Sequence, residues 1–453
     1  MSRIWTRLAL VICGSALAIS FQAHSGVSAA RPESLSPATR NVINDWALIA
    51  QNSIAPTVVN AGLNAYGAMV PIAMYDAVVA IEGGYEPYTA PVMAPAGADV
   101  TAAAATAAYR VLHERFPAQQ ASLDSQYASY LSGIDDGQPK LDGIAVGEAV
   151  AQQLLAVRAG DNLATCTGTC STTWVQPTPG PGVFEPFPAG SIPQGADLRF
   201  VRPWTMRSAD QFRPGGPLPL TSLEYADDWI ETRDWGASTG SRRSSYDDDT
   251  ARFWAGENFS MFRSTLWNAA TDYGLDVVQT ARLFAMGFTA GSDGGIGCFD
   301  AKYYYLAWRP RSAIRRADTD GNPLTEPADP TWTPYLATPN HPEYPAQHTC
   351  VSYARFDTMR AFFGGDVPIR IETINPPAPM VSPSIRTYDK FNDIEKEIVD
   401  ARVFGGMHFR HSDMNGAQLG RKVAKNLVNN FFRPTSSVAR HHAFGLQMSM
   451  AMR

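Results

Sequence analysis

The chain has 453 residues, 45% of them hydrophobic, so it is long enough for one large domain or two ordinary ones with an ample core. Its formal net charge is −6 at pH 7. A mildly acidic protein gives no reason to expect nucleic acid or an anionic membrane surface as a partner.

The N-terminal segment has the layout of a secretory signal peptide. Arg3 and Arg7 precede an apolar run over residues 8–19, and Val27-Ser28-Ala29 places small residues at a cleavage site. A membrane anchor is the alternative, but such a run is shorter than the roughly 20 residues of a spanning helix. We expect cleavage near Ala29 and a secreted or periplasmic protein. Removing 29 of 453 residues leaves 424 and shifts the charge from −6 to −8, because two Arg are lost.

Amphipathic and Ala-rich stretches predict helices through most of the chain, with little strand-like alternation. They are 37–52, 62–83, 100–115, 118–133, 141–158, 222–235, 249–271, 275–290, 299–309, 346–363, 393–404 and 413–431. The proline-rich segment 172–220 predicts a long ordered excursion over the surface. Segments 318–344 and 373–388 predict loops, because they combine Pro with polar residues.

This pattern predicts an all-α helical bundle with long Pro-rich loops. We expect a signal peptide over 1–29 and a single domain over 30–453. Within that domain, we expect a helical part at 36–290 and a site-bearing part at about 291–431. No stretch after the signal peptide looks long and apolar enough to span a bilayer. The sequence leaves open whether the protein forms a homo-oligomer.

Four cysteines remain once Cys13 leaves with the signal peptide. Cys166 and Cys170 lie between polar, Gly-containing flanks, which favours a small disulfide-closed loop in an exported protein. Two free thiols or half of a zinc site are the alternatives, although no second Cys/His pair has zinc-like spacing. Cys298 and Cys350 could form a disulfide or remain as buried thiols.

Three short segments carry candidate chemistry. In the first, Lys302 and Arg309 are seven residues apart, so a helix would place both on one face, and Pro310 would end that helix. Two fixed cations beside Trp308 suit an anion. Taken alone, however, such a pair usually forms a solvated helix face.

The second segment runs from His341 to His348 and includes Pro345, Ala346 and Gln347. Pro345 would open a helix, and the unpaired N–H groups at a helix start bind anions. His348 would lie just inside that helix. A lone histidine at such a position is more often structural.

The third segment contains Arg402 and His408 with two glycines between them, followed by Asp413. Arginine offers a planar fork to two oxyanion oxygens, and a neutral histidine nitrogen can attack phosphorus or bind a metal oxyanion. Asp413 could fix the histidine tautomer. The alternative is an Arg–Asp pair beside a core histidine.

Together the segments resemble the three-part signature of vanadium haloperoxidases and type 2 phosphatidic acid phosphatases, which reads Lys-x6-Arg-Pro, Pro-Ser-Gly-His and Ser-Arg-x5-His. The first part matches fully. In the second, Ala346 and Gln347 replace Ser and Gly, and in the third Ala401 replaces Ser. Asp413 follows His408 by five residues rather than the usual four. Losing the serine donor could cost about 1.5–3 kcal/mol of anion affinity.

The resemblance implies a role for each matching residue. Lys302, Arg309 and Arg402 would clamp the oxyanion, with Ala346 and Gln347 contributing to its binding. His408 would be the axial ligand of a vanadate cofactor, or the phosphorylated nucleophile of a phosphatase. His348 would act as the acid–base residue.

The haloperoxidase branch is the closer resemblance, with hydrogen peroxide and a halide as substrates. His341, seven residues before His348, matches a bromoperoxidase-type histidine that tunes the halide, so bromide is favoured. The alternatives are an exported acid phosphatase that acts on a phosphate ester, and a non-catalytic relative that has kept an oxyanion pocket.

Overall fold

The computed structural model describes residues 41–58 and 60–435, so the predicted signal peptide lies outside the described residues. Fourteen α-helices, three short 3₁₀ helices and two strands are found in this part of the chain. In chain order the elements are α1 Val42–Ile54, α2 Asn60–Tyr66, α3 Met69–Glu82, α4 Val100–Arg115, η1 Pro117–Gln119, α5 Gln120–Leu131, α6 Gln138–Val157, η2 Ala196–Phe200, α7 Leu223–Gly236, α8 Ser245–Phe253, α9 Asn258–Asp272, α10 Val277–Tyr305, α11 Pro310–Arg315, η3 Ala317–Thr319, α12 Gln347–Phe363, β1 Ile369–Glu372, β2 Ile385–Tyr388, α13 Phe391–Phe404 and α14 Arg410–Asn430.

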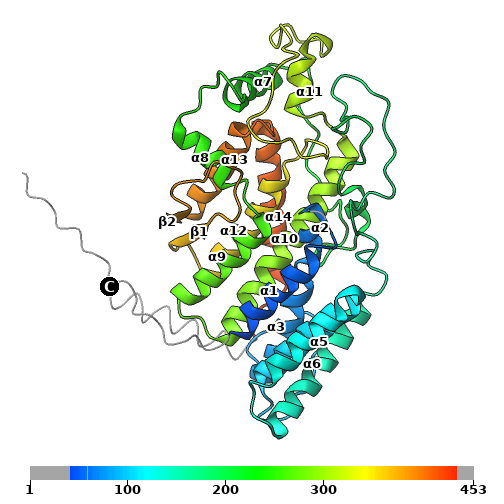
Figure 1. Ribbon diagram of the computed structural model, residues 1–453, viewed down its shortest axis with the longest axis vertical. Coiled ribbons are helices and arrows are strands. Elements are labelled where there is room, and N and C mark those ends of the chain that lie inside the picture. Colours follow the sequence, from blue (N-terminus) through cyan, green and yellow to red (C-terminus); the bar gives the residue numbers. More distant parts are fainter. Residues whose placement is uncertain (1–40, 59, 436–453) are drawn as a thin grey trace, which may run out of the picture. The chain divides into compact units, whose positions relative to one another are not determined.

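The predicted helical class is confirmed, and its centre is formed by α10, α12 and α14, which pack against one another (Figure 1). Helix α3 packs on α10 and α4, and α4 also contacts α5 and α6. Helix α13 contacts α7, α8, α12 and α14. One large apolar cluster joins both halves of the chain and includes the fully buried side chains of Trp46, Tyr75, Phe284 and Phe299. Each such side chain contributes about 1.5–3 kcal/mol by burial.

The prediction of two helices at 275–290 and 299–309 is wrong, because α10 is one continuous helix of 29 residues. The glycines between the two predicted ranges are places where neighbouring residues approach the helix closely. A Cβ at Gly294 would lie 2.8 Å from the Cys350 carbonyl oxygen, and one at Gly291 would lie 2.4 Å from the Arg355 Nε. Tertiary packing therefore outweighs the low helix propensity of glycine.

Two other predicted helices are interrupted. The stretch 62–83 is divided between α2 and α3, and 249–271 is divided between α8 and α9. Between the latter two helices, a Cβ at Gly256 would meet the Ile374 carbonyl oxygen at 2.7 Å. The predicted loop 373–388 also ends in a strand, β2, which pairs antiparallel with β1.

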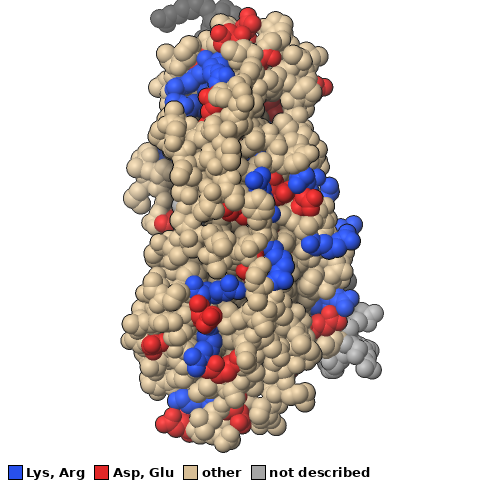
Figure 2. All heavy atoms as spheres, turned by 90° about the vertical axis from the view of Figure 1, so that its right-hand side faces the viewer, with Lys and Arg blue, Asp and Glu red and all other residues tan. Residues whose placement is uncertain are grey.

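The stretch Gly62–Glu82 is long and apolar enough to cross a membrane, contrary to the expectation from sequence, with a mean hydropathy of 1.3. However, 89% of its apolar window is buried inside the fold, as in the core helix of a soluble protein. On the face shown in Figure 2, most of the surface is uncharged, and basic side chains largely lie beside acidic ones in small groups.

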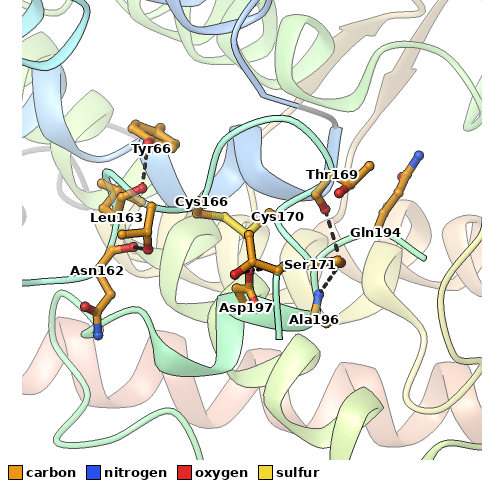
Figure 3. The surroundings of a disulfide bond; sticks show 12 residues. Tyr66, Asn162, Leu163, Cys166, Thr169, Cys170, Ser171, Gln194, Ala196 and Asp197 are labelled. Carbon is orange, nitrogen blue, oxygen red and sulfur yellow. Dashed lines mark hydrogen bonds between the residues drawn. A yellow bond between two sulfur atoms is a disulfide. The ribbon is translucent and has the colours of Figure 1, made fainter. Parts of the chain in front are cut away.

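Cys166 and Cys170 form the predicted disulfide (Figure 3). The small loop that it closes holds the start of η2 through backbone bonds: Gly195 N donates to Thr169 O at 2.9 Å, and Asp197 N donates to Cys170 O at 2.8 Å. A Cβ at Gly195, which has a φ of 82°, would meet the Phe299 ring at 2.3 Å. The disulfide loop therefore fixes a segment that packs directly on α10.

Candidate active site

The sequence motifs lie at the ends of α10, α11, α12 and α13. Lys302 is in the last turn of α10, and Arg309 is the N-cap of α11. The prediction that they share a helix face is wrong, because Pro310 restricts Arg309 to an extended conformation with a ψ of 155°. His348 is in the first turn of α12, and Arg402 is in the last turn of α13.

Lys302 is fully buried and holds the loop that precedes α12. Its Nζ donates to the carbonyl oxygens of Pro342 and Glu343, at 2.8 and 2.9 Å. Burial lowers the pKa of Lys302 to about 8, and the positive charge of Arg309 adds to this effect. The lysine therefore connects the first motif to the second through the backbone.

Arg309 connects the second motif to the third. Its Nε donates to the His341 carbonyl oxygen at 2.8 Å, and its Nη1 donates to the Met407 carbonyl oxygen at 2.9 Å. Nη1 also lies 3.1 Å from His408 Nε2, and Nη2 lies 2.9 Å from His341 Nδ1. Burial is the main reason that the pKa of Arg309 falls to about 10, which still leaves it charged near neutral pH.

Glu343 orients His408, a role for which the sequence offered Asp413 as a candidate. Its Oε1 lies 2.9 Å from His408 Nδ1 and accepts from Phe409 N at 3.2 Å. No hydrogen bond joins Asp413 to His408 among the described residues. The prediction for Asp413 is therefore wrong, because the acid that faces the ring comes from the second motif.

These contacts determine the tautomer of His408. A guanidinium group can only donate, so Nε2 accepts from Arg309, and the proton is on Nδ1, facing the carboxylate of Glu343. Burial, followed by the charges of Arg309 and Lys302, lowers the pKa of His408 well below its usual value. His408 is therefore a neutral base whose lone pair is on Nε2.

Arg402 is a buried cation with unused hydrogen-bonding capacity. Its Nη2 contacts the Met407 Sδ at 3.0 Å. Among the described residues, the Nε and Nη1 of Arg402 have no hydrogen-bond partner. The two carboxylate oxygens of Asp413 have none either. Arg402 lowers the pKa of Asp413, but the larger effect of burial raises it well above its usual value. An unpaired buried guanidinium is costly unless an anion reaches it.

A cavity of about 490 Å³ opens beside this arginine. Arg402, Met407, Gln347 and His348 contribute to its wall. His348 is half-buried, and desolvation together with the nearby cations lowers its pKa well below the usual value. Lys302, Arg309 and His408 do not line the cavity. Met407 links them to its wall, because it contacts both Arg309 and Arg402.

The start of α12 also faces the cavity. Its N-cap, Ala346, is fully buried and makes no side-chain cap, so the first N–H groups of the helix have neither an intrahelical acceptor nor a cap. Helix α14 comes close at Gly416, where a Cβ would lie 2.7 Å from the Ala346 carbonyl oxygen. Gln347 adds a side-chain amide to the cavity wall.

Another buried cation, Arg355, contacts two asparagines of the cavity wall. Arg355 donates to Asn258 Oδ1 at 2.6 Å and to Asn64 Oδ1 at 2.9 Å, and both asparagines line the cavity. No ion pair with Arg355 is found among the described residues, and burial lowers its pKa to about 9. Because the amide oxygens face Arg355, the amide N–H₂ groups are free to point elsewhere.

The structure therefore divides the predicted site residues between two layers. Lys302, Arg309, His341 and His408 form one hydrogen-bonded network with Glu343, while Gln347, His348 and Arg402 line the cavity. His341 contacts Arg309 and the Phe299 ring rather than the cavity. Cys298 and Cys350 are free, buried thiols.

Sequence reasoning missed Glu343, Met407, Asn64, Asn258 and Arg355. Glu343 had a detectable signal, since it is an acid inside the second motif. The two asparagines lie on α2 and α9, which carry no motif, and Arg355 lies on α12 beyond the second motif, so none of the three had a signal in the sequence.

Comparisons with known proteins show which fold the chain has. Residues 282–436 match the family model of the VCPO second helical-bundle domain. A bacterial vanadium-dependent iodoperoxidase has a similar structure, with a TM-score of 0.69 at 22% identity over 87% of this chain and 96% of that one. The chain has the vanadium haloperoxidase fold.

Two structures of bacterial vanadium-dependent chloroperoxidase are similar to this haloperoxidase-fold chain at 16% identity. The apo form has a TM-score of 0.63 and covers 88% of this chain and 96% of its own. The holo form has a TM-score of 0.62 and covers 87% and 93%. No curated protein sequence matches the chain.

Proposed function

We propose that the protein is a vanadium-dependent haloperoxidase, in which hydrogen peroxide oxidises a halide by two electrons to a hypohalous acid and is itself reduced to water. The proposal depends above all on one observation. Arg402, a buried guanidinium with two unpaired nitrogen atoms, lines a cavity, and its charge acts on a neutral histidine, His408, whose tautomer is fixed.

The donor set fits a tetrahedral oxyanion such as vanadate. Lys302, Arg309 and Arg402 are three buried cations, whereas burial raises the pKa of Glu343 to about 7 and that of Asp413 well above its usual value. The site therefore has a net positive charge near neutral pH and favours an anion. Vanadate would be held by the Arg402 fork and the N–H groups at the start of α12, and by His408 Nε2 in place of the contact that this atom makes with Arg309.

Bound vanadate would supply the Lewis acidity that activates hydrogen peroxide. The residues of the chain orient the ligand nitrogen and transfer protons. Glu343 keeps the His408 proton on Nδ1, so that Nε2 remains a donor of its lone pair. His348, neutral and open to the cavity, can take up and release the protons that peroxide binding and water formation require.

The halide would enter the 490 Å³ cavity, whose wall includes Asn64 and Asn258, with Arg355 behind them. Bromide remains the favoured halide because of His341. This residue would act through Arg309, which it contacts, rather than by touching the halide. Iodide and chloride oxidation are the alternatives to measure beside it.

An acid phosphatase is the second candidate, because a neutral, oriented His408 could also attack phosphorus. The third is a non-catalytic oxyanion-binding relative, which the loss of a hydroxyl at Ala346 favours. Reconstitution with orthovanadate in phosphate-free buffer, followed by metal analysis and assays of chloride, bromide and iodide oxidation, tests the proposal. Vanadium-dependent halide oxidation supports it. Phosphomonoester hydrolysis without vanadium, inhibited by added vanadate, would establish the phosphatase instead.

Wild-type protein that binds vanadate but is inactive in both assays would be a binder. In that case Ala346→Ser should decide whether the missing hydroxyl is the cause, since activity gained by this change alone identifies a degenerate relative.

A further inference from the structure

The side-chain amides of Asn64 and Asn258 lie side by side on the wall of the 490 Å³ cavity. Asn64 lies on α2 and Asn258 is the first residue of α9, so the two amides come from helices that are far apart in the sequence. Both amide oxygens accept from one guanidinium, that of Arg355, through its Nη2 and Nη1 respectively. This shared partner holds the two amides next to each other.

Arg355 also fixes which way each amide points. A guanidinium has N–H donors and no acceptor, so each asparagine must present its oxygen to Arg355 and turn its N–H₂ group away. Within the described part of the chain, neither Nδ2 atom has a hydrogen-bond partner, and neither is sealed from solvent as the Arg355 Nε is. Asn64 is only 6% exposed, so its free donors face the cavity that it lines. Such unpaired donors are usually satisfied by a bound partner.

The positive charge next to the amides is not neutralised. Arg355 is 1% exposed, and burial alone lowers its pKa, to about 9, which leaves it charged near neutral pH. Its guanidinium carbon lies 4.3 Å from the centre of the Phe262 ring, and Gly291 of α10 leaves room for its Nε, so the group has a fixed position. Because Arg355 polarises the amide oxygens, the N–H₂ groups become stronger donors.

Helix α9 begins at the same wall. Its N-cap, Glu257, makes no side-chain cap, so the first N–H groups of the helix have neither an intrahelical acceptor nor a cap. Glu257 is the only acid among the described residues of the cavity wall. It is exposed, and its carboxylate accepts from Ser260 Oγ at 2.9 Å and from Asn375 Nδ2 at 2.8 Å. The wall around the two amides therefore favours an anion.

We propose that Asn64 and Asn258 bind the halide, through hydrogen bonds from their N–H₂ groups that the charge of Arg355 strengthens. Arg355 does not line the cavity, so the ion would not contact it, and the site suits a small monovalent anion that is held weakly and released readily. His348 lies two turns before Arg355 on α12 and lines the same cavity. The proposal rests on the proposed function for the identity of the anion, but not for its binding.

Bromide is the probe, and the broadening of its NMR signal measures binding to the full-length protein without vanadate. Asn64→Asp and Asn258→Asp keep the oxygen that Arg355 contacts but replace the free N–H₂ group with a negative oxygen. Each should lower bromide affinity at least about tenfold, because a donor to an ion is lost and the charge of Arg355 is neutralised. Asn392→Asp is the matched control. Asn392 also accepts from an arginine, Arg360, at 2.8 Å, but it does not line the cavity, so its bromide affinity should equal that of wild type.

Arg402→Met separates this site from the oxyanion clamp, and bromide binding should persist in this variant. Circular dichroism shows whether each variant folds. If the buried Asn64→Asp variant does not fold, Asn258→Asp decides alone, because its position is half-buried and lies in a first helical turn, which suits aspartate. Absence of bromide binding in the wild type, or unchanged binding in Asn258→Asp, overturns the proposal. Loss of binding in Arg402→Met but not in Asn258→Asp also overturns it, because the clamp would then hold the bromide.

Kinetics separate this inference from the proposed function. If the protein oxidises bromide, Asn258→Asp should raise the KM for bromide at least about tenfold and leave kcat nearly unchanged, because only substrate binding is weakened. An unchanged KM overturns the inference and leaves the haloperoxidase proposal in place. Bromide binding that depends on Asn258, in a protein without peroxidase activity, supports the anion site and contradicts the haloperoxidase proposal.

Discussion

His408 Nδ1 lies 2.9 Å from Glu343 Oε1, so the residue expected to hold the oxyanion is oriented by an acid from another motif. Lys302 Nζ binds the carbonyl oxygen of this same Glu343 at 2.9 Å. One residue therefore fixes the positions of a cation and a neutral base that are more than a hundred residues apart in the sequence.

Replacing Glu343 with Gln should weaken vanadate binding by about 10- to 100-fold, because the amide no longer fixes the proton on His408 Nδ1. Equilibrium dialysis with metal analysis measures this loss. Glu395→Gln is the matched control: Glu395 is also buried with a pKa raised to about 7, but it pairs with Arg421. Equal losses in both variants would show that general destabilisation, and not orientation of His408, is the cause.

His348 and His408 should have different roles. His408→Ala should abolish vanadate binding, since it removes the ligand nitrogen. His348→Ala should leave vanadate bound and lower the turnover of halide oxidation by about 10²–10⁴-fold, as expected for loss of an acid–base group. Metal content and kcat, measured on the same preparations, separate the two effects. Full turnover by His348→Ala would contradict the role given to this residue.

Orthovanadate or phosphate should raise the thermal unfolding midpoint of the wild type, because each would satisfy the unpaired nitrogen atoms of Arg402. At 100 times its Kd, a ligand adds about 2.7 kcal/mol of stability. Arg402→Met should lose most of this ligand-dependent rise, whereas Arg360→Met, which removes a half-buried arginine paired with Asp357, should keep it. A midpoint that responds equally in both variants would place the anion elsewhere.

His341 should make the protein less stable in acid. Its pKa is lowered well below 6.5 by burial, so the unfolded chain binds the proton more readily than the folded one. Its contribution to stability is complete above the unfolded pKa of about 6.5 and is lost as the pH falls below it. Relative to His341→Phe, wild type should therefore lose up to about 1.4 kcal/mol per pH unit between pH 6.5 and 5.5. Urea unfolding of both proteins at pH 7.5 and 5.5 measures this, and a constant difference would contradict it.

The double change Cys166→Ser and Cys170→Ser should lower the free energy of unfolding by about 2 kcal/mol on the loop-closure model, because the loop is short. Unreduced peptide mapping should show this disulfide and two free thiols at Cys298 and Cys350. A reductant should reduce the stability of wild type but not that of the double variant. Two free thiols at 166 and 170 would contradict the assignment.

Local patterns predicted helices well where one periodic stretch forms one helix, as at 100–115, which matches α4. They failed where contacts between residues distant in the sequence determine where a helix begins or ends. Two helices were predicted at 275–290 and 299–309, but Gly291 and Gly294 between them are contact points in the single helix α10. Arg309 lies outside the helix of Lys302 because of Pro310. The cation set was predictable from its motifs. The role of Glu343 could not be predicted, because only the folded loop brings this residue to His408.

Helix α10 belongs to both halves of the chain. It contacts α1, α2, α3 and α9 as well as α12 and α14, and it is buried along most of its length. The family match begins at residue 282, five residues after the helix starts. Expression of residues 282–436 alone would leave apolar surface of this helix without its partners. Split reporters, circular permutants or tags inserted near this boundary should therefore fail, and exposed surface loops are the better insertion points.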